Sequence, residues 1–339
     1  MTVPCRRPSP VQLSVYLSIC LPSGLLFGAL AGGCANTSGS TLAVCDPLTS
    51  AAAARSPWQD ATVFTVVMEN HSRGQIFGNP KAPYINQLAR ENAVAEGYHD
   101  SFVHPSEPNY FWMVAGQNFG ILDDGDPISH HIATRSHIAD QLELAGLSWK
   151  SYQESMGEPC GLASHGRYGA KHNPFVYFDD VNGWDGQAFH PEQRCVAHVV
   201  DYTELDGDIA RRALPRYAFI TPNLDNDMHD GSIADGDAWL ARELPKLMAT
   251  ENYQHGGVIF LLWDEGGGSP ASDDPPFIAI SPRAAHGLRS KVDYDTSSYL
   301  KTVQDMLGVT ELPCAAQSDR TTTQSMTDLF TMPLTGAST

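Results

Sequence analysis

Two uninterrupted runs of apolar and β-branched residues constrain the fold of this 339-residue chain more than any other feature. Residues 61–68 read Ala-Thr-Val-Phe-Thr-Val-Val-Met, and residues 258–263 read Val-Ile-Phe-Leu-Leu-Trp. Neither run contains a charged residue, so each predicts a strand that is buried on both faces. Such strands are typical of parallel sheets that have helices packed on both sides.

Shorter segments repeat the alternation of strand and helix. We predict two further strands, at residues 217–221 and 277–280, and helices at residues 81–95, 136–146, 234–249 and 297–307. We therefore expect an α/β domain with a mostly parallel central sheet and helices on both faces. Residues 155–200 are rich in Gly, His and Pro and are expected to form a long insertion near the functional site.

The N-terminal segment has the features of an export signal. Arg6 and Arg7 precede a mostly apolar stretch at residues 11–30, and small residues then lead to Cys34. This order predicts a signal peptide at residues 1–33. The cysteine suits a lipid anchor, which would make the protein a cell-envelope lipoprotein. Ordinary cleavage in the same region is the alternative and would give a secreted or periplasmic protein.

Composition suggests three further segments after the signal. Residues 34–58 are rich in Ala, Ser and Thr and are expected to form a tether or linker. Residues 59–315 carry the predicted strands and helices and are expected to form the folded domain. Residues 316–339 are expected to form a C-terminal tail.

Cysteine usage agrees with export. Of the seven cysteines, Cys5 and Cys20 lie in the signal and Cys34 is the candidate lipid site. The remaining four form an even set, which predicts two disulfides in an oxidising compartment and allows three pairings. We favour the pairs Cys160–Cys195 and Cys45–Cys314.

The charge balance restricts the partners of the protein. Lys and Arg total 21 against 39 Asp and Glu, which gives a net charge of -18. That charge disfavours binding to nucleic acid and to anionic lipid, so membrane contact is expected only through a lipid anchor at Cys34. A phosphate ester remains a suitable substrate, because a bound cation reverses the local field.

Acidic and amide side chains follow both long apolar strands. Glu69 and Asn70 come after the first strand, and Asp264 and Glu265 come after the strand at residues 258–263. The carboxyl ends of parallel strands share one edge of a sheet, where ligands bind. Oxygen ligands of this kind suit a hard divalent cation. The alternative interpretation is that these are solvated loop carboxylates or helix caps.

Two other loops carry candidates for chemistry. Ser106 lies between Pro105 and Pro108, just before a helix predicted to begin near Asn109, whose positive end favours an oxyanion. The alternative is a serine in an ordinary turn. The loop after residues 217–221 contains an Asp and a His close enough to chelate a metal, or it is an acidic loop that caps the next helix.

These segments, taken in order, resemble the bacterial phosphoesterase family of acid phosphatases and phospholipases C within the alkaline phosphatase superfamily. The resemblance covers about residues 60–310 and implies an alkaline-phosphatase-like fold. Its matching pieces are Val66-Val-Met-Glu-Asn-His71, Pro105-Ser-Glu-Pro-Asn-Tyr110 with Gly116, Tyr152-Gln-Glu154, Lys171-His-Asn-Pro-Phe175, Asn226-Asp-Met-His-Asp230, Gly236-Asp-Ala-Trp-Leu240, Trp263-Asp-Glu-Gly266 and Tyr299-Leu-Lys-Thr-Val303.

The resemblance implies metal ligands. Glu69 and Asn70 are expected to bind a divalent cation together with Asp264 and Glu265. This donor set favours Ca²⁺, Mg²⁺ or Mn²⁺, with Zn²⁺ as the alternative. Asp227 is expected to belong to a second metal site.

The resemblance also implies the residues that act on the substrate. Ser106 is expected to be the nucleophile and Asn109 to hold a phosphoryl oxygen. His229 is expected to bind the second metal or to protonate the leaving group. Lys171 and His172 are candidates for contact with the phosphate.

One position departs from the family pattern. Thr296 stands where the family often has a histidine that completes a two-metal site. We therefore expect one tightly held cation, unless another residue such as His286 replaces that histidine.

The sequence thus predicts a metal-dependent phosphoric ester hydrolase that acts on phosphate monoesters through a phosphoserine. A phospholipase C-like phosphodiesterase is the nearest alternative. A non-catalytic surface lipoprotein and a serine carboxylesterase are alternatives from other classes.

Overall fold

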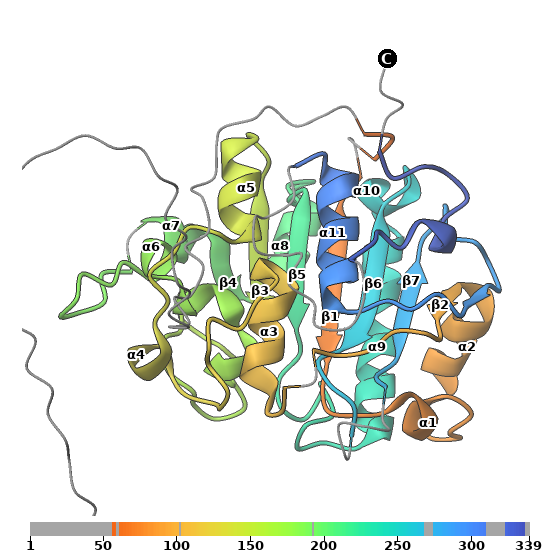
Figure 1. Ribbon diagram of the computed structural model, residues 1–339, viewed down its shortest axis with the longest axis horizontal. Helices are drawn as coiled ribbons and strands as arrows, with labels where there is room; N and C mark the ends of the chain where they lie inside the picture. Colours follow the sequence, from red (N-terminus) through yellow and green to blue (C-terminus); the bar gives the residue numbers. More distant parts are fainter. Residues whose placement is uncertain are drawn as a thin grey trace, which may run out of the picture. The chain divides into compact units, whose positions relative to one another are not determined.

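The computed structural model describes residues 56–58, 61–101, 103–191, 193–267, 274–309 and 323–335 (Figure 1). All of them belong to one compact unit, Val44–Thr339. The predicted signal peptide, the lipid site at Cys34 and the pair Cys45–Cys314 lie outside the described residues. Those predictions and the predicted segment boundaries therefore stay predictions.

The described residues form an eight-stranded sheet in the order β4-β3-β5-β1-β6-β7-β2-β8. β7 runs antiparallel to both of its neighbours, and the remaining strands run parallel to one another. The predicted mostly parallel sheet is thereby confirmed. The strands are β1 Val63–Met68, β2 Ala93–Ala95, β3 Trp149–Gln153, β4 Val199–Asp201, β5 Tyr217–Thr221, β6 Val258–Trp263, β7 Phe277–Ile280 and β8 Arg289–Ser290.

The three central strands end at the same edge. β1 pairs in parallel with β5 on one side and with β6 on the other, and Met68 lies opposite Trp263. The next residues, Glu69 and Asp264, therefore leave the sheet side by side. Every residue of these three strands is buried, as their uninterrupted apolar sequences predict.

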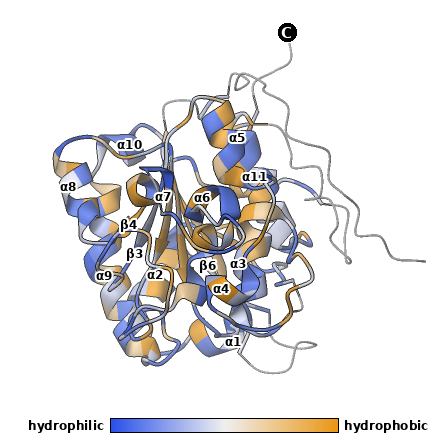
Figure 2. Cartoon of the chain, turned by 90° about the vertical axis from the view of Figure 1, so that its left-hand side faces the viewer, coloured by the Kyte–Doolittle hydropathy of each residue, from blue (hydrophilic) through white to orange (hydrophobic). Residues whose placement is uncertain are grey.

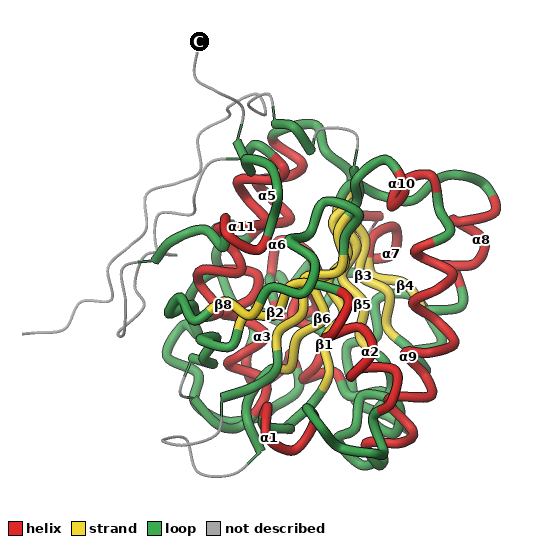
Figure 3. The backbone as a smooth tube through the Cα atoms, turned by 90° about the vertical axis from the view of Figure 1, so that its right-hand side faces the viewer, coloured by secondary structure: helices red, strands yellow, loops and turns green. Residues whose placement is uncertain are grey.

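Helices cover both faces of the sheet. One buried cluster joins the sheet to α3, α5 and α11, and a second joins the opposite face to α2, α8 and α9 (Figures 1 and 3). Hydrophobic residues gather on the strands between these layers (Figure 2). The helices are α1 Arg73–Ile76, α2 Pro83–Glu91, α3 Ser106–Ala115, α4 Pro127–His130, α5 Ile138–Leu144, α6 Asp179–Asn182, α7 Gln193–His198, α8 Glu204–Ala210, α9 Ile233–Met248, α10 Glu251–Gln254 and α11 Thr296–Leu307.

Most of the predicted elements are confirmed, and one is wrong at its end. The strands at 217–221, 258–263 and 277–280 have the predicted bounds. The helix predicted at residues 81–95 stops at Glu91, and Ala93–Ala95 form β2 instead. Backbone pairing of this short apolar segment with β7 and β8 outweighs its helical spacing.

The segment at residues 155–200 contains little regular structure apart from short helical turns such as η1 Ala170–His172 and η2 Pro174–Tyr177. It is closed by the disulfide Cys160–Cys195, which confirms that predicted pair. No helix in the described part of the chain is both long enough and apolar enough to cross a membrane.

Candidate active site

Ser106 is the first residue of α3, three positions before the predicted helix start at Asn109. Pro105 precedes the helix in an extended conformation, and Pro108 lies in the first turn, where a missing N–H removes no intrahelical hydrogen bond. The fully buried side chain of Glu69 accepts a hydrogen bond from Ser106 Oγ at 3.0 Å. The helix thus presents the serine, with the positive end of its dipole, to the residues that follow β1.

Oxygen atoms from three segments converge beside Ser106. Asn70 Oδ1 lies 3.3 Å from Ser106 Oγ, 2.9 Å from Glu69 Oε2 and 3.1 Å from Asp264 Oδ1. The backbone N–H of Asn70 also donates to Asp264 Oδ1 at 3.0 Å. An amide oxygen that faces carboxylate oxygens repels them. Two arrangements remove that repulsion: a cation among the oxygens, or the amide reversed so that its nitrogen donates.

Ionisation of the carboxylates in this group is unfavourable unless a positive charge compensates it. Burial raises the pKa of Glu69 well above its ordinary range, and the nearby charges of Asp264 and Asp227 raise it further. Burial likewise raises the pKa of Asp264, with Glu265 adding to the effect. The pKa of Asp227 is raised to about 8, chiefly by burial. Such buried acids are stabilised by protons or by a bound cation, so the donor set fits a divalent metal ion.

Glu265 directly follows Asp264 and is held by two side chains. Its Oε2 accepts a hydrogen bond from Asn109 Nδ2 at 3.1 Å and lies 3.2 Å from His104 Nδ1. His104 Nε2 also faces Asp100 at 3.6 Å, and the two carboxylates, Asp100 first, raise the pKa of His104 to about 10. His104 is therefore a cation at neutral pH that compensates Glu265 and Asp100.

A second group that could hold a metal consists of Glu69, His172 and Asp227, all buried. His172 Nε2 lies 3.4 Å from Glu69 Oε2, and His172 Nδ1 lies 3.2 Å from Asp227 Oδ2. Burial lowers the pKa of His172, so its ring is neutral and able to act as a ligand. His172 thus occupies the place beside Asp227 that we expected for the imidazole of His229.

The ring of His229 contacts residues other than Asp227. Its backbone N–H donates to Asp227 Oδ1 at 2.7 Å, whereas its ring lies between Asp230 and Lys171, at 2.8 Å and 3.2 Å. Lys171 Nζ in turn donates to Asp124 Oδ2 at 2.8 Å. Burial lowers the pKa of Lys171, but pairing with Asp124 outweighs it and the pKa is raised overall.

Tyr110 is a further buried residue that touches the site, whereas the contacts of Thr296 and His286 are with other residues. Tyr110 Oη donates to Glu69 Oε1. Thr296 Oγ1 lies 3.1 Å from Tyr98 Oη, so the threonine has a hydroxyl partner. His286 bonds to the carbonyl of Glu91 on the surface, before the start of β2 and therefore at the opposite edge of the sheet. His286 is not placed to replace a metal-binding histidine.

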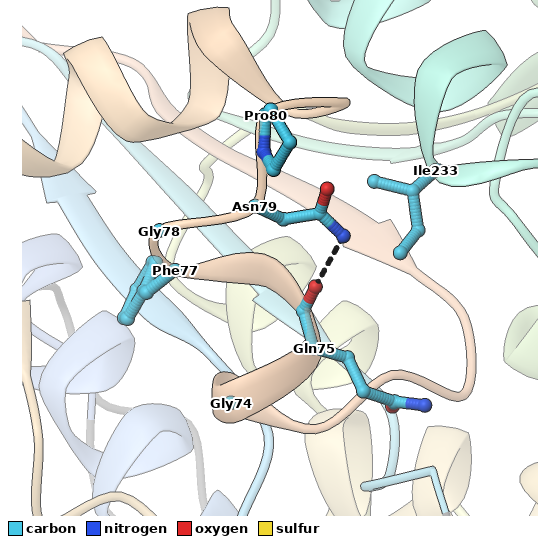
Figure 4. Close-up of a pocket in the computed structure, with 7 residues that line it drawn as sticks. All are labelled: Gly74, Gln75, Phe77, Gly78, Asn79, Pro80 and Ile233. Atoms are coloured by element: carbon cyan, nitrogen blue, oxygen red, sulfur yellow. Dashed lines mark hydrogen bonds between the residues drawn. The ribbon is translucent and has the colours of Figure 1, made fainter.

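A pocket of about 590 Å³ lies outside this cluster (Figure 4). Its walls come from α1 with the turn that follows it and from the first residue of α9. None of the candidate site residues lines it. In Figure 4 the side chain of Asn79 points towards Ile233 on the opposite wall, with Pro80 next to Asn79, and no charged side chain lines the pocket.

The sheet and its two helical layers match the fold of the alkaline phosphatase superfamily. The chain is similar in fold to a structure from that superfamily from Vibrio parahaemolyticus, with a TM-score of 0.53 and 10% identity over 78% of this chain and 71% of the other. At that identity the likeness concerns the fold alone.

The sequence comparisons identify a narrower class of protein than the fold does. Residues 35–310 match the phosphoesterase family, and the chain belongs to that family of phosphoric ester hydrolases. It is 34% identical to the phosphatidylinositol-3-phosphatase of Mycobacterium tuberculosis over 63% of this chain and 67% of that protein. It is 32% identical to the phosphate-repressible acid phosphatase of Penicillium chrysogenum over 54% of this chain and 43% of that protein. The chain thus spans less than half of the fungal relative.

Proposed function

We propose that this protein is a metal-dependent phosphoric ester hydrolase that forms a phosphoserine at Ser106 and prefers phosphate monoesters. The observation that carries the proposal is the position of Ser106 Oγ. It lies at the N-terminus of α3, 3.0 Å from Glu69 Oε2 and 3.3 Å from Asn70 Oδ1. A hydroxyl at the positive end of a helix, beside ligands for a cation, suits a nucleophile for an anionic substrate.

The metal-holding residues we propose are Glu69, Asn70, Asp264 and Glu265. They are oxygen donors that suit Ca²⁺, Mg²⁺ or Mn²⁺. A bound cation supplies Lewis acidity and lowers the pKa of a nearby hydroxyl. Asp227, with His172, is the candidate for a second and weaker site.

Other residues of the chain carry out the remaining steps of the proposed reaction. Ser106 Oγ passes its proton to Glu69 Oε2, which already accepts its hydrogen bond, and forms a bond to phosphorus while the ester P–O bond breaks. His229, whose ring is partly exposed, gives a proton to the leaving oxygen. Lys171 and the first N–H groups of α3 stabilise the phosphoryl oxygens. Asn109 acts mainly by holding Glu265 in place, because its amide nitrogen already donates to that carboxylate. Water then cleaves the phosphoserine and releases inorganic phosphate.

The preference for monoesters is supported by the two relatives described above, both of which are named phosphatases. A phospholipase C-like diesterase, a serine carboxylesterase and a non-catalytic binding protein are the alternatives. A panel of a phosphomonoester, a phosphodiester and a carboxylester, each with and without chelator, separates them. We expect the monoester to be hydrolysed fastest and the chelator to abolish turnover. Carboxylester hydrolysis that resists the chelator would favour the esterase.

Substitution of the nucleophile tests the mechanism directly. Ser106→Ala should lower kcat by several orders of magnitude, on the order of the losses seen when other nucleophiles are removed. Acid quenching of the wild-type protein with a labelled monoester should trap label on Ser106. Ser164→Ala is the control and should keep normal turnover, because its hydroxyl bonds to Asp126 and to the backbone of Ala170 and, among the described residues, to none of the candidate site residues. Wild-type turnover in the Ser106 variant would refute the phosphoserine.

A further inference from the structure

The carboxylate of Asp124 accepts hydrogen bonds from two donors next to the proposed nucleophile, Ser106. Its Oδ1 accepts a hydrogen bond from the backbone N–H of Glu107 at 3.1 Å, and its Oδ2 accepts one from Lys171 Nζ at 2.8 Å. Glu107 directly follows Ser106 in the first turn of α3. One carboxylate thus bridges a helix N-terminus and an ammonium group.

These two donors belong to the surroundings in which a phosphoryl group would bind. The first N–H groups of a helix have no intrahelical acceptors and favour an anion. Few free backbone N–H groups are available at the start of α3, because Pro105 and Pro108 carry no N–H. Lys171 Nζ lies 3.2 Å from His229 Nε2, so the ammonium group also borders the proposed proton donor. Two buried polar atoms without hydrogen-bond partners, His172 Nε2 and Asp227 Oδ2, lie in the same surroundings.

The loop that carries Asp124 is held by α3, whereas the side chain of Asp124 is partly exposed to solvent. Glu107 returns a bond to this loop, because its carboxylate accepts from the N–H of Gly125 at 2.7 Å and lies 2.6 Å from His130 Nδ1. The side chain of Asp124 is 30% exposed. A change of rotamer can therefore move its carboxylate into water without moving α3 or the loop.

We propose that Asp124 holds the place of a phosphoryl oxygen in the free protein and competes with phosphate for Glu107 N–H and Lys171. This inference rests on the proposed function. It makes Asp124 a specificity-determining residue, because repulsion between a carboxylate and a ligand grows with the charge of the ligand. Asp124 thus weakens the binding of a dianionic monoester or of inorganic phosphate more than that of a monoanionic diester.

The test compares two neighbouring substitutions that remove the same charge. Asp124→Asn keeps the shape of the side chain but removes its charge from Lys171. Asp123→Asn is the matched control, because Asp123 is 80% exposed and its carboxylate lies 3.5 Å from His130 rather than near Lys171. In Asp124→Asn, the Ki for inorganic phosphate and the KM for a monoester should fall about tenfold relative to Asp123→Asn. The KM for a diester should fall less.

The outcomes separate this inference from the proposed function. Equal Ki values in the two variants, or a higher Ki in Asp124→Asn, would overturn the role of Asp124 and would mean that it only orients Lys171. Thermal unfolding of both variants identifies a folding defect, and Asp124→Ala should then shift the Ki in the same direction as Asp124→Asn. If the wild-type protein hydrolyses no phosphoester, the proposed function fails. Calorimetric titration with inorganic phosphate still decides whether Asp124 competes.

Discussion

Tyr110 is a buried residue whose hydroxyl contacts the group around Ser106 at Glu69. It donates to Glu69 Oε1, and that hydrogen bond lowers the pKa of Glu69 against the larger effect of burial. Its ring stacks on His172 with centroids 5.2 Å apart. Phenylalanine at this position keeps the stacking and removes only the donor.

We predict that Tyr110→Phe shifts the acidic limb of the pH–kcat/KM profile to higher pH. Without the hydroxyl the pKa of Glu69 is higher still, so a higher pH is needed to ionise it for cation binding. Profiles measured at one fixed, subsaturating metal concentration check this. Tyr299→Phe is the control, because that buried hydroxyl bonds to Thr65 and Tyr217 instead. A limb that stays in place, or moves equally in both variants, would contradict the prediction.

The sequence revealed those candidate residues that directly follow buried strands. Glu69 and Asp264 could be placed together because parallel strands end at a common edge. His104 and His172 could not be placed in this way, because each reaches its partner from a segment outside the sheet, which no strand register fixes. A signal for His104 was present, since it immediately precedes Pro105 in the loop of Ser106, but its partners depend on the fold.

Among the elements, the segment at residues 155–200 is held by the disulfide Cys160–Cys195. It brings Lys171 and His172 to the site with little regular structure of its own. We predict that the double substitution Cys160→Ala with Cys195→Ala lowers the free energy of unfolding by about 3 kcal/mol, as expected for a closed loop of moderate length. Urea unfolding monitored by tryptophan fluorescence measures this.

The same double variant should lower kcat/KM more than it lowers the affinity for the cation. Lys171 lies within the loop that the disulfide closes, whereas Glu69, Asn70 and Asp264 follow central strands and keep their support. Cys160→Ala alone would leave Cys195 free for other pairing, so the double variant is the cleaner comparison. Unchanged stability and turnover would show that the segment is fixed by its packing alone.

Strands were predicted where the sequence has a clear uncharged apolar run and were missed where the strand is very short or lacks such a run. β1, β5 and β6 are buried at every position, and their sequences contain no charged residue. β3 reads Trp-Lys-Ser-Tyr-Gln and β4 only Val-Val-Asp, so neither shows a distinct apolar run. Their position is fixed by pairing with β5 and with each other, which is information that only the assembled sheet contains.

At the scale of the whole molecule, the buried carboxylates link stability to pH. The pKa of Asp227 is about 8 in the folded chain against an ordinary value of 3.8, and burial raises the pKa of Glu107 to about 7. Between pH 4 and pH 8 the folded state therefore binds more protons than the unfolded state. By linkage, the metal-free protein should lose stability as pH rises through this window.

A divalent cation should reverse that trend. It binds the ionised carboxylates of the folded state, so the stabilisation that it gives grows as pH rises. We predict that the difference in Tm between samples with Ca²⁺ and with EDTA widens from pH 5 to pH 8, and that about one equivalent of metal stays bound after dialysis. Asp264→Asn should abolish that difference, because it removes a charged oxygen from the group around Ser106. Asp227→Asn should make Tm in EDTA depend less on pH, because it removes one titrating group, while most of the effect of Ca²⁺ on Tm remains.

A difference in Tm that is constant across the pH range would mean that the carboxylates beside Ser106 are not the cation site. Two tightly held zinc ions per chain would mean that the group of Glu69, His172 and Asp227 binds a metal as strongly as the group around Ser106 does.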